Sequence, residues 1–146
     1  MPGHIPWRKV DLPLQAQRAI WIGTTRPDGR PHAMPVWFCW DGASIYFVTK
    51  RATQKARNLA REPWVVAHLG DGDDTIVLEG PAEVVTDEAE RERIEALYRD
   101  KYVDPHSGAR ATIHEAGADL YRVRVRRVMT WEYGIVATRT DWRFDD

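Results

Sequence analysis

The sequence has a single cysteine, no long apolar run and no excess of charge of either sign. Cys39 has no second cysteine to pair with, and no clustered histidines accompany it, so neither an intramolecular disulfide nor a zinc site is expected. No apolar stretch approaches the roughly 18 residues of a membrane span, and the first residues lack a basic segment followed by an apolar run. We therefore expect a cytoplasmic protein without a bound metal or a membrane partner.

Charge balance also argues against a nucleic-acid partner. The chain carries 21 Lys and Arg residues against 22 Asp and Glu residues, so any electrostatic recognition has to be local. Its 146 residues suit one domain over residues 1–146. Seven tryptophans in a chain of this length favour an aromatic ligand pocket or a subunit interface, although ordinary core and surface positions explain them equally well.

The apolar periodicity predicts a strand-rich fold with short helices. Asp11 suits the N-cap of a helix over residues 11–19, and Pro13 is tolerated in its first turn. The alternation of residues and the Gly-containing turns predict the following strands: residues 20–25, 32–40, 44–49, 64–69, 75–85 (interrupted by a bulge or an edge position at Gly80 and Pro81) and 120–128, the last leading on toward residue 144. A period near 3.6 predicts helices from residue 52 and from residue 87, and residues 103–117 read as a loop.

This order of elements favours an antiparallel barrel over a parallel doubly wound sheet. Hairpin-length connections join most of the strands, which is typical of antiparallel barrels. No G-x-G-x-x-G or Walker sequence is present, and no G-x-S-x-G turn supports a serine hydrolase.

The most informative segment is residues 49–61, which hold five basic residues and no acidic one. A strand ends and a helix begins there, so free backbone N–H groups and the positive end of the helix accompany Lys50, Arg51, Thr53 and Lys55. This predicts a phosphate-binding turn, with Lys55 as the strongest candidate and Asn58 on the same side of the helix. The alternative is a solvated basic helix face.

Several segments in order resemble the pyridoxamine-phosphate-oxidase-like split-barrel superfamily. They are residues 29–38 (GRPHAMPVWF), 45–49 (IYFVT), 55–63 (KARNLAREP) and 79–82 (EGPA). The closing residues 138–144 (TRTDWRF) resemble the tail of members that use the deazaflavin coenzyme F-420. The chain lacks a recognisable counterpart of the C-terminal substrate-phosphate motif of the oxidases themselves, which puts oxidation of a vitamin B6 phosphate in doubt.

The resemblance implies a mainly β fold, a six-stranded antiparallel split β-barrel with short flanking helices. It further implies a homodimer with two cofactor sites at the subunit interface, each holding coenzyme F-420 or, alternatively, FMN. The implied cofactor-binding residues come from three parts of the chain: His32, Met34, Pro35, Val36 and Trp37 beside the ring; Lys50, Arg51, Thr53, Lys55 and Asn58 near the phosphate; and Trp131, Tyr133 and Trp142 from the partner chain.

The expected activity is hydride transfer from the reduced coenzyme to an unsaturated small-molecule acceptor, such as an enone, a quinone or a tetrapyrrole. The alternatives are an FMN-dependent reductase or oxidase, and a module that binds a flavin or haem without turnover. No catalytic residue is assigned. His32 suits either a proton donor or a structural hydrogen bond, and Cys39 suits a buried apolar position better than a redox centre.

Overall fold

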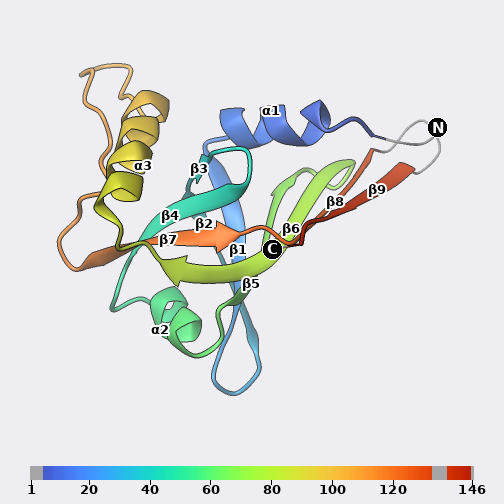
Figure 1. Ribbon diagram of the computed structural model, residues 1–146, viewed down its shortest axis with the longest axis horizontal. Coiled ribbons are helices and arrows are strands. Elements are labelled where there is room, and N and C mark those ends of the chain that lie inside the picture. Colours follow the sequence, from blue (N-terminus) through green and yellow to red (C-terminus); the bar gives the residue numbers. More distant parts are fainter. Residues whose placement is uncertain (1–4, 133–137, 146) are drawn as a thin grey trace.

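The computed structural model describes residues 5–132 and 138–145. These residues form three helices and nine antiparallel strands, which loops connect (Figure 1). The helices are α1 (Arg8–Ala16), α2 (Gln54–Arg61) and α3 (Glu88–Lys101). The strands are β1 (Ala19–Thr25), β2 (Pro31–Trp37), β3 (Cys39–Trp40), β4 (Ser44–Lys50), β5 (Trp64–Gly70), β6 (Asp74–Val84), β7 (Ala118–Arg124), β8 (Arg127–Glu132) and β9 (Thr138–Arg143).

The strands form a curled half-barrel in the order β2-β1-β5-β6-β7-β4-β3, with β8 and β9 attached beyond β6. The expected run 32–40 is broken at Phe38, so its first part (β2) pairs with β1 and its second part (β3) pairs with β4. Taken as one interrupted strand, β2 and β3 connect the two edges of a six-stranded split barrel. The mainly β fold expected from the sequence is thereby confirmed.

The bend of β6 at Gly80 allows one strand to serve both halves of the barrel. Its first part pairs with β5 and β8, and residues Ala82 to Val84 pair with β7. A Cβ atom on Gly80 would lie 2.0 Å from the carbonyl oxygen of Arg124, which only a glycine avoids. The interruption expected at Gly80 and Pro81 is therefore a bend with close backbone approach.

Two apolar clusters stabilise the fold. The larger lies on the concave side of the sheet, where Ile22, Phe47 and Leu78 are fully buried and α1 adds Val10 and Leu14. The second lies between α3 and the opposite side of β3, β4 and β7, where Tyr46 and Leu120 pack with Ile94, Tyr98 and Tyr102. Buried Cys39 belongs to the same cluster. Burial raises the pKa of the Cys39 thiol to about 11, which suits an apolar position and not a thiolate.

Two local expectations are wrong. The first helix begins at Arg8, so Asp11 is not its cap and Pro13 lies inside it. Asp11 instead accepts a hydrogen bond from the indole Nε1 of Trp40, which sequence spacing gives no means to foresee. The expected long strand over 120–128 is two strands, β7 and β8, that belong to different parts of the barrel. None of the three helices in the described ranges is long and apolar enough to cross a membrane.

Candidate functional site

The register of β2 against β1 divides the residues expected beside the cofactor ring. His32, Met34 and Val36 pair with Thr24, Ile22 and Ile20, whose side chains are buried on the concave side of the sheet. Pro35 and Trp37 therefore project from the opposite side, because successive side chains of a strand alternate. Only His32, Met34 and Val36 can therefore form one surface with α2.

Three nitrogen-bearing side chains gather at the hairpin end of this surface, and we call Arg26, His32 and Lys55 the basic cluster. The Nδ1 atom of His32 and the Nε atom of Arg26 are buried, and neither has a hydrogen-bond partner among the described residues. Burial lowers the pKa of His32, and the nearby charges of Arg26 and Lys55 lower it further. His32 is therefore neutral near physiological pH and has one nitrogen available to a ligand.

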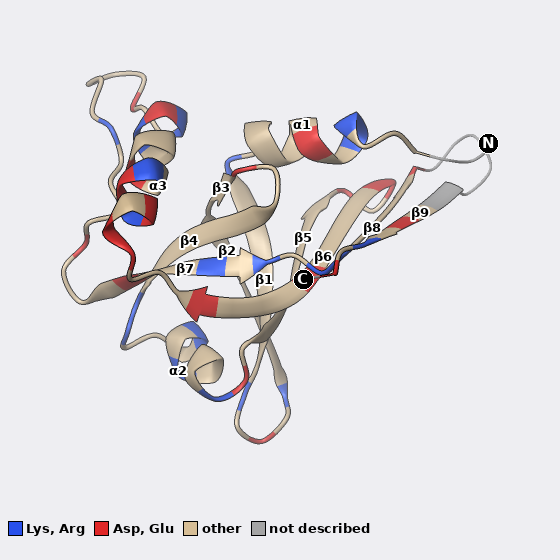
Figure 2. Cartoon of the chain, viewed as in Figure 1, with Lys and Arg blue, Asp and Glu red and all other residues tan. Residues whose placement is uncertain are grey.

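Lys55 is a half-buried cation without a counter-charge. Burial lowers the pKa of its amine, and no ion pair formed by the described residues includes Lys55 or Arg26. Helix α2 itself carries Lys and Arg but no acidic residue (Figure 2). A buried unpaired charge is unfavourable unless something compensates it, so the basic cluster is suited to an anionic group.

Thr53 and Asn58 hold α2 in place. The Thr53 hydroxyl caps the helix by accepting from Ala56 N–H (3.2 Å) and donating to the carbonyl oxygen of Lys50 (2.8 Å). Asn58 is fully buried, and its Nδ2 donates to the Thr24 hydroxyl on β1 over 2.9 Å. The polar groups of both residues already have partners within the chain, and these bonds hold the helix that carries Lys55.

Lys50 and Arg51 have acidic partners from a distant part of the chain. The Lys50 amine lies 3.5 Å from Glu115, and the Arg51 guanidinium forms a two-pronged pair with Asp119 at 3.1 Å. These acids come from the end of the 103–117 loop and the start of β7. Of the three cations in the expected basic turn, Lys50 and Arg51 are therefore paired, and Lys55 has no ion pair among the described residues.

The tryptophans expected from the partner chain lie far from β2 within one chain. Trp131 is on β8, and its Nε1 donates to the carbonyl oxygen of Gly72 (3.1 Å). Trp142 on β9 packs edge-on against Trp7, with 5.2 Å between ring centroids. Tyr133 lies outside the described residues. Strands β1, β5 and β6 separate β8 from β2, so Trp131 and Trp142 do not reach the basic cluster of their own chain.

Sequence reasoning missed Arg26, the third member of the basic cluster. It precedes the turn that joins β1 and β2, and its backbone N–H donates to the carbonyl oxygen of Arg30. The hairpin was predicted, so extending the alternation from Thr24 by two residues would have placed Arg26 on the same side as His32. No group of three or more His, Cys, Asp or Glu side chains in the described ranges could hold a metal ion.

Comparison with known proteins identifies the class. Residues 7–132 match the family described as pyridoxamine 5'-phosphate oxidase, and the chain belongs to that family, whose members include flavin-dependent oxidoreductases of the split-barrel type. No match was found among curated proteins.

Three solved structures illustrate the similarity. A conserved hypothetical protein from Mycobacterium tuberculosis is 26% identical, with a TM-score of 0.68 over 90% of this chain and 88% of that one. An F420 reductase is also 26% identical, with a TM-score of 0.63 over 81% of this chain and 94% of that one. An FMN-binding protein related to pyridoxamine 5'-phosphate oxidase, from Nostoc punctiforme, is 14% identical, with a TM-score of 0.65 over 98% and 99%.

Proposed function

We propose that this protein is a cytoplasmic, homodimeric oxidoreductase that transfers a hydride from reduced coenzyme F-420 to an unsaturated small-molecule acceptor, such as an enone, a quinone or a tetrapyrrole. The observation that carries the proposal is the basic cluster. It combines buried nitrogen atoms of Arg26 and His32 that lack partners with a half-buried Lys55 amine that lacks a counter-charge. These groups fit the phosphate that follows the ribityl chain of a flavin-type cofactor.

The choice of the deazaflavin is supported by the similarity to an F420 reductase over most of both chains. FMN is the alternative, because it carries a phosphate at the same position and the basic cluster suits both. The longer acidic tail of the deazaflavin needs further cations, and exposed Arg57 on α2 is available for it.

Each residue at the site has a distinct part in the proposed binding. Lys55 and Arg26 neutralise the phosphate, and His32 offers its Nδ1 atom to an oxygen or an N–H of the ligand. Met34 and Val36, which follow His32 on the same side of β2, provide an apolar wall that excludes water. When bound, the cofactor supplies the hydride from its carbon 5, and the protein supplies binding, orientation and exclusion of solvent.

The homodimer is supported by an apolar surface on the convex side of the sheet. Trp21, Trp64, Val66 and Trp131 are each 37% to 45% exposed, and the strand registers place all four on this side. Exposed large apolar side chains on neighbouring strands are typical of a protein interface. A second copy seated there would cover them and bring its own residues toward the first copy.

The test is titration of cofactor-free protein with F-420 and, separately, with FMN. Replacing Lys55 with methionine should weaken binding about 10- to 100-fold, the equivalent of one charge-assisted hydrogen bond. Arg61→Met, which removes an exposed charge from the same helix, is the matched control and should change affinity far less. Reduction of an added enone or quinone by the loaded protein then distinguishes an enzyme from a module that only binds the cofactor.

Each outcome bears on a different part of the proposal. Tight binding of FMN alone would replace the deazaflavin with the alternative cofactor. Binding of neither cofactor by the folded protein would refute the cofactor assignment, and equal affinity of the Lys55→Met variant would refute the role of the basic cluster.

A further inference from the structure

A second site lies at the other end of β2. A cavity of about 300 Å³ is lined by Arg18, Trp37, Tyr102, Asp104 and Arg110, together with small apolar residues of the 103–111 loop. This volume is at the lower end of small-molecule sites. Trp37 projects from the convex side of β2, so the cavity and the basic cluster lie on opposite sides of that strand.

An aromatic platform forms one wall of this cavity. Trp37 stacks on Tyr102 with ring centroids 4.5 Å apart and an interplanar angle of 5°, yet its side chain is still 47% exposed. Tyr102 is itself fixed, because its hydroxyl accepts from Phe38 N–H (2.8 Å) and lies 2.7 Å from the carbonyl oxygen of Arg18. Tyr102 thus covers one face of the Trp37 indole, and the exposed part of the indole can stack with the flat ring of a ligand.

The lining of the cavity holds two arginines and one aspartate. The Arg18 guanidinium carbon lies 5.2 Å from the Trp37 ring centroid, and Arg18 forms no ion pair among the described residues. Arg110 donates to the carbonyl oxygen of Arg99 and lies 3.7 Å from Asp100.

The carboxylate that lines the cavity is already engaged. Asp104 Oδ1 accepts from the backbone N–H groups of His106 (2.7 Å) and Ser107 (3.0 Å), and these bonds lower its pKa. Arg18 is therefore the group best placed to meet an added anion.

We propose that this cavity binds a planar aromatic carboxylate. The ring stacks on Trp37, and the carboxylate accepts hydrogen bonds from the Arg18 guanidinium, whose planar fork matches two carboxylate oxygens. Arg110 contributes long-range attraction. The assignment depends on residues that take no part in the basic cluster, so it holds whichever cofactor the protein uses.

The test is calorimetric titration of the full-length protein with 2-naphthoate as the probe. Arg18→Gln should weaken binding about 10- to 100-fold through the lost charge-assisted bond, and Trp37→Leu by up to about 10-fold through the lost stacking. Arg8→Gln, an exposed arginine of α1 outside the cavity, is the matched control and should bind as the wild type does. The neutral 2-naphthamide and the non-aromatic cyclohexanecarboxylate should both bind more weakly than 2-naphthoate.

The proposal would be overturned by no binding of 2-naphthoate to the wild type, by equal binding of 2-naphthamide, or by unchanged affinity in Arg18→Gln. If Arg18→Gln does not fold, Arg18→Lys keeps the charge without the fork and should still lose affinity. Loading the protein with its cofactor should leave the affinity for 2-naphthoate unchanged. Competition between the two would place the probe at the cofactor site and refute a separate site.

Discussion

Two half-buried lysines show how similar burial serves different purposes. Burial lowers the pKa of both the Lys55 and the Lys101 amines. Lys101 donates to the carbonyl oxygen of Phe38 (3.0 Å), and its amine lies 3.7 Å from the centroid of the Phe38 ring. Lys55 has no comparable contact among the described residues. The contacts of Lys101 thus offset part of the cost of burying its charge, whereas the charge of Lys55 is left for a ligand.

The lowered pKa of Lys101, about 8 against an ordinary 10.5, makes a prediction about stability and pH. Below pH 8 both the folded and the unfolded protein hold the proton, so the full cost of burying the charge is present. As the pH rises from 8 toward 10.5, the folded protein loses this proton first and that cost disappears.

The change that tests this is Lys101→Met. At neutral pH the variant should be more stable than the wild type by on the order of 1 kcal/mol, after allowing for solvent screening of a partly exposed amine. Its advantage should shrink between pH 8 and 10.5 in urea unfolding experiments. A constant difference across that range would mean that the amine titrates normally, and a destabilised variant would mean that the contacts with Phe38 outweigh the burial.

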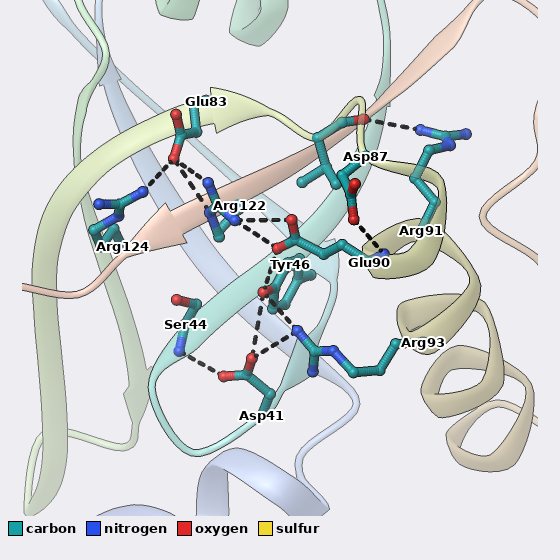
Figure 3. A network of polar contacts seen from close by, with 11 residues as sticks. Asp41, Ser44, Tyr46, Glu83, Asp87, Glu90, Arg91, Arg93, Arg122 and Arg124 are labelled. Atoms are coloured by element: carbon teal, nitrogen blue, oxygen red, sulfur yellow. Dashed lines mark hydrogen bonds and ion pairs between the residues drawn. The ribbon is translucent and has the colours of Figure 1, made fainter.

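At the scale of elements, a polar network fastens α3 to the barrel (Figure 3). Arg122 on β7 is its centre: Nη1 donates to both oxygens of Glu90 on α3, at 2.6 and 2.8 Å, and Nη2 donates to Glu83 on β6. Glu90 also accepts from the Tyr46 hydroxyl (2.8 Å), which in turn receives a bond from Arg93. Three strands and one helix are thereby held by one set of charges.

Replacing Arg122 with methionine should therefore loosen α3 more than the rest of the fold. The side chains of Arg122 and Glu90 are only 23% and 17% exposed, so the unpaired carboxylate should cost about 2 kcal/mol of unfolding free energy. Arg124→Met is the matched control on the same strand; its side chain is 51% exposed, and the loss should stay below about 1 kcal/mol. Hydrogen exchange should accelerate in the α3 amides of the Arg122 variant, and equal exchange in both variants would contradict this assignment.

The elements were predictable where a local pattern determines them. The hairpin of β1 and β2, both later helices and the bend at Gly80 follow from alternation, period and turn residues. The start of α1 and the break at Phe38 were not predictable, because they depend on residues far away in the sequence. Asp11 accepts a hydrogen bond from Trp40, and the N–H of Phe38 donates to the Tyr102 hydroxyl. Contacts across 29 and 64 residues leave no trace in a local pattern.

The candidate site shows the same limit at a larger scale. The sequence assigns Lys55 to the cofactor phosphate and His32 to the cofactor ring, and the structure brings the two close together, with His32 on the concave side of β2. Lys50 and Arg51 carry equal charge in the same segment, but Glu115 and Asp119 neutralise them from more than sixty positions away. Net basic character of a segment is thus a local property, whereas a free cation is a property of the folded molecule.

At the scale of the whole molecule, the convex apolar surface predicts a dimer. A single substitution on this surface, Trp21→Glu, should disrupt it. Trp21 contributes to this surface from β1, where it stacks on His68 of β5 with 6.3 Å between ring centroids. In a two-fold interface each substitution occurs twice, so Trp21→Glu buries two carboxylates that face an apolar partner. We expect the dissociation constant of the dimer to rise by more than about 100-fold.

Leu12→Glu is the matched control for this experiment, because Leu12 is a 58% exposed apolar side chain on α1, away from the convex surface. Sedimentation or light scattering should give the wild type and the control about twice the 16.8 kDa chain mass, and the Trp21 variant a monomer at the same concentration. The variant should also lose affinity for the cofactor, because the proposed site is completed by the partner. A monomeric variant with undiminished cofactor affinity would show that cofactor binding does not require the dimer. The basic cluster of one chain would then be sufficient for binding.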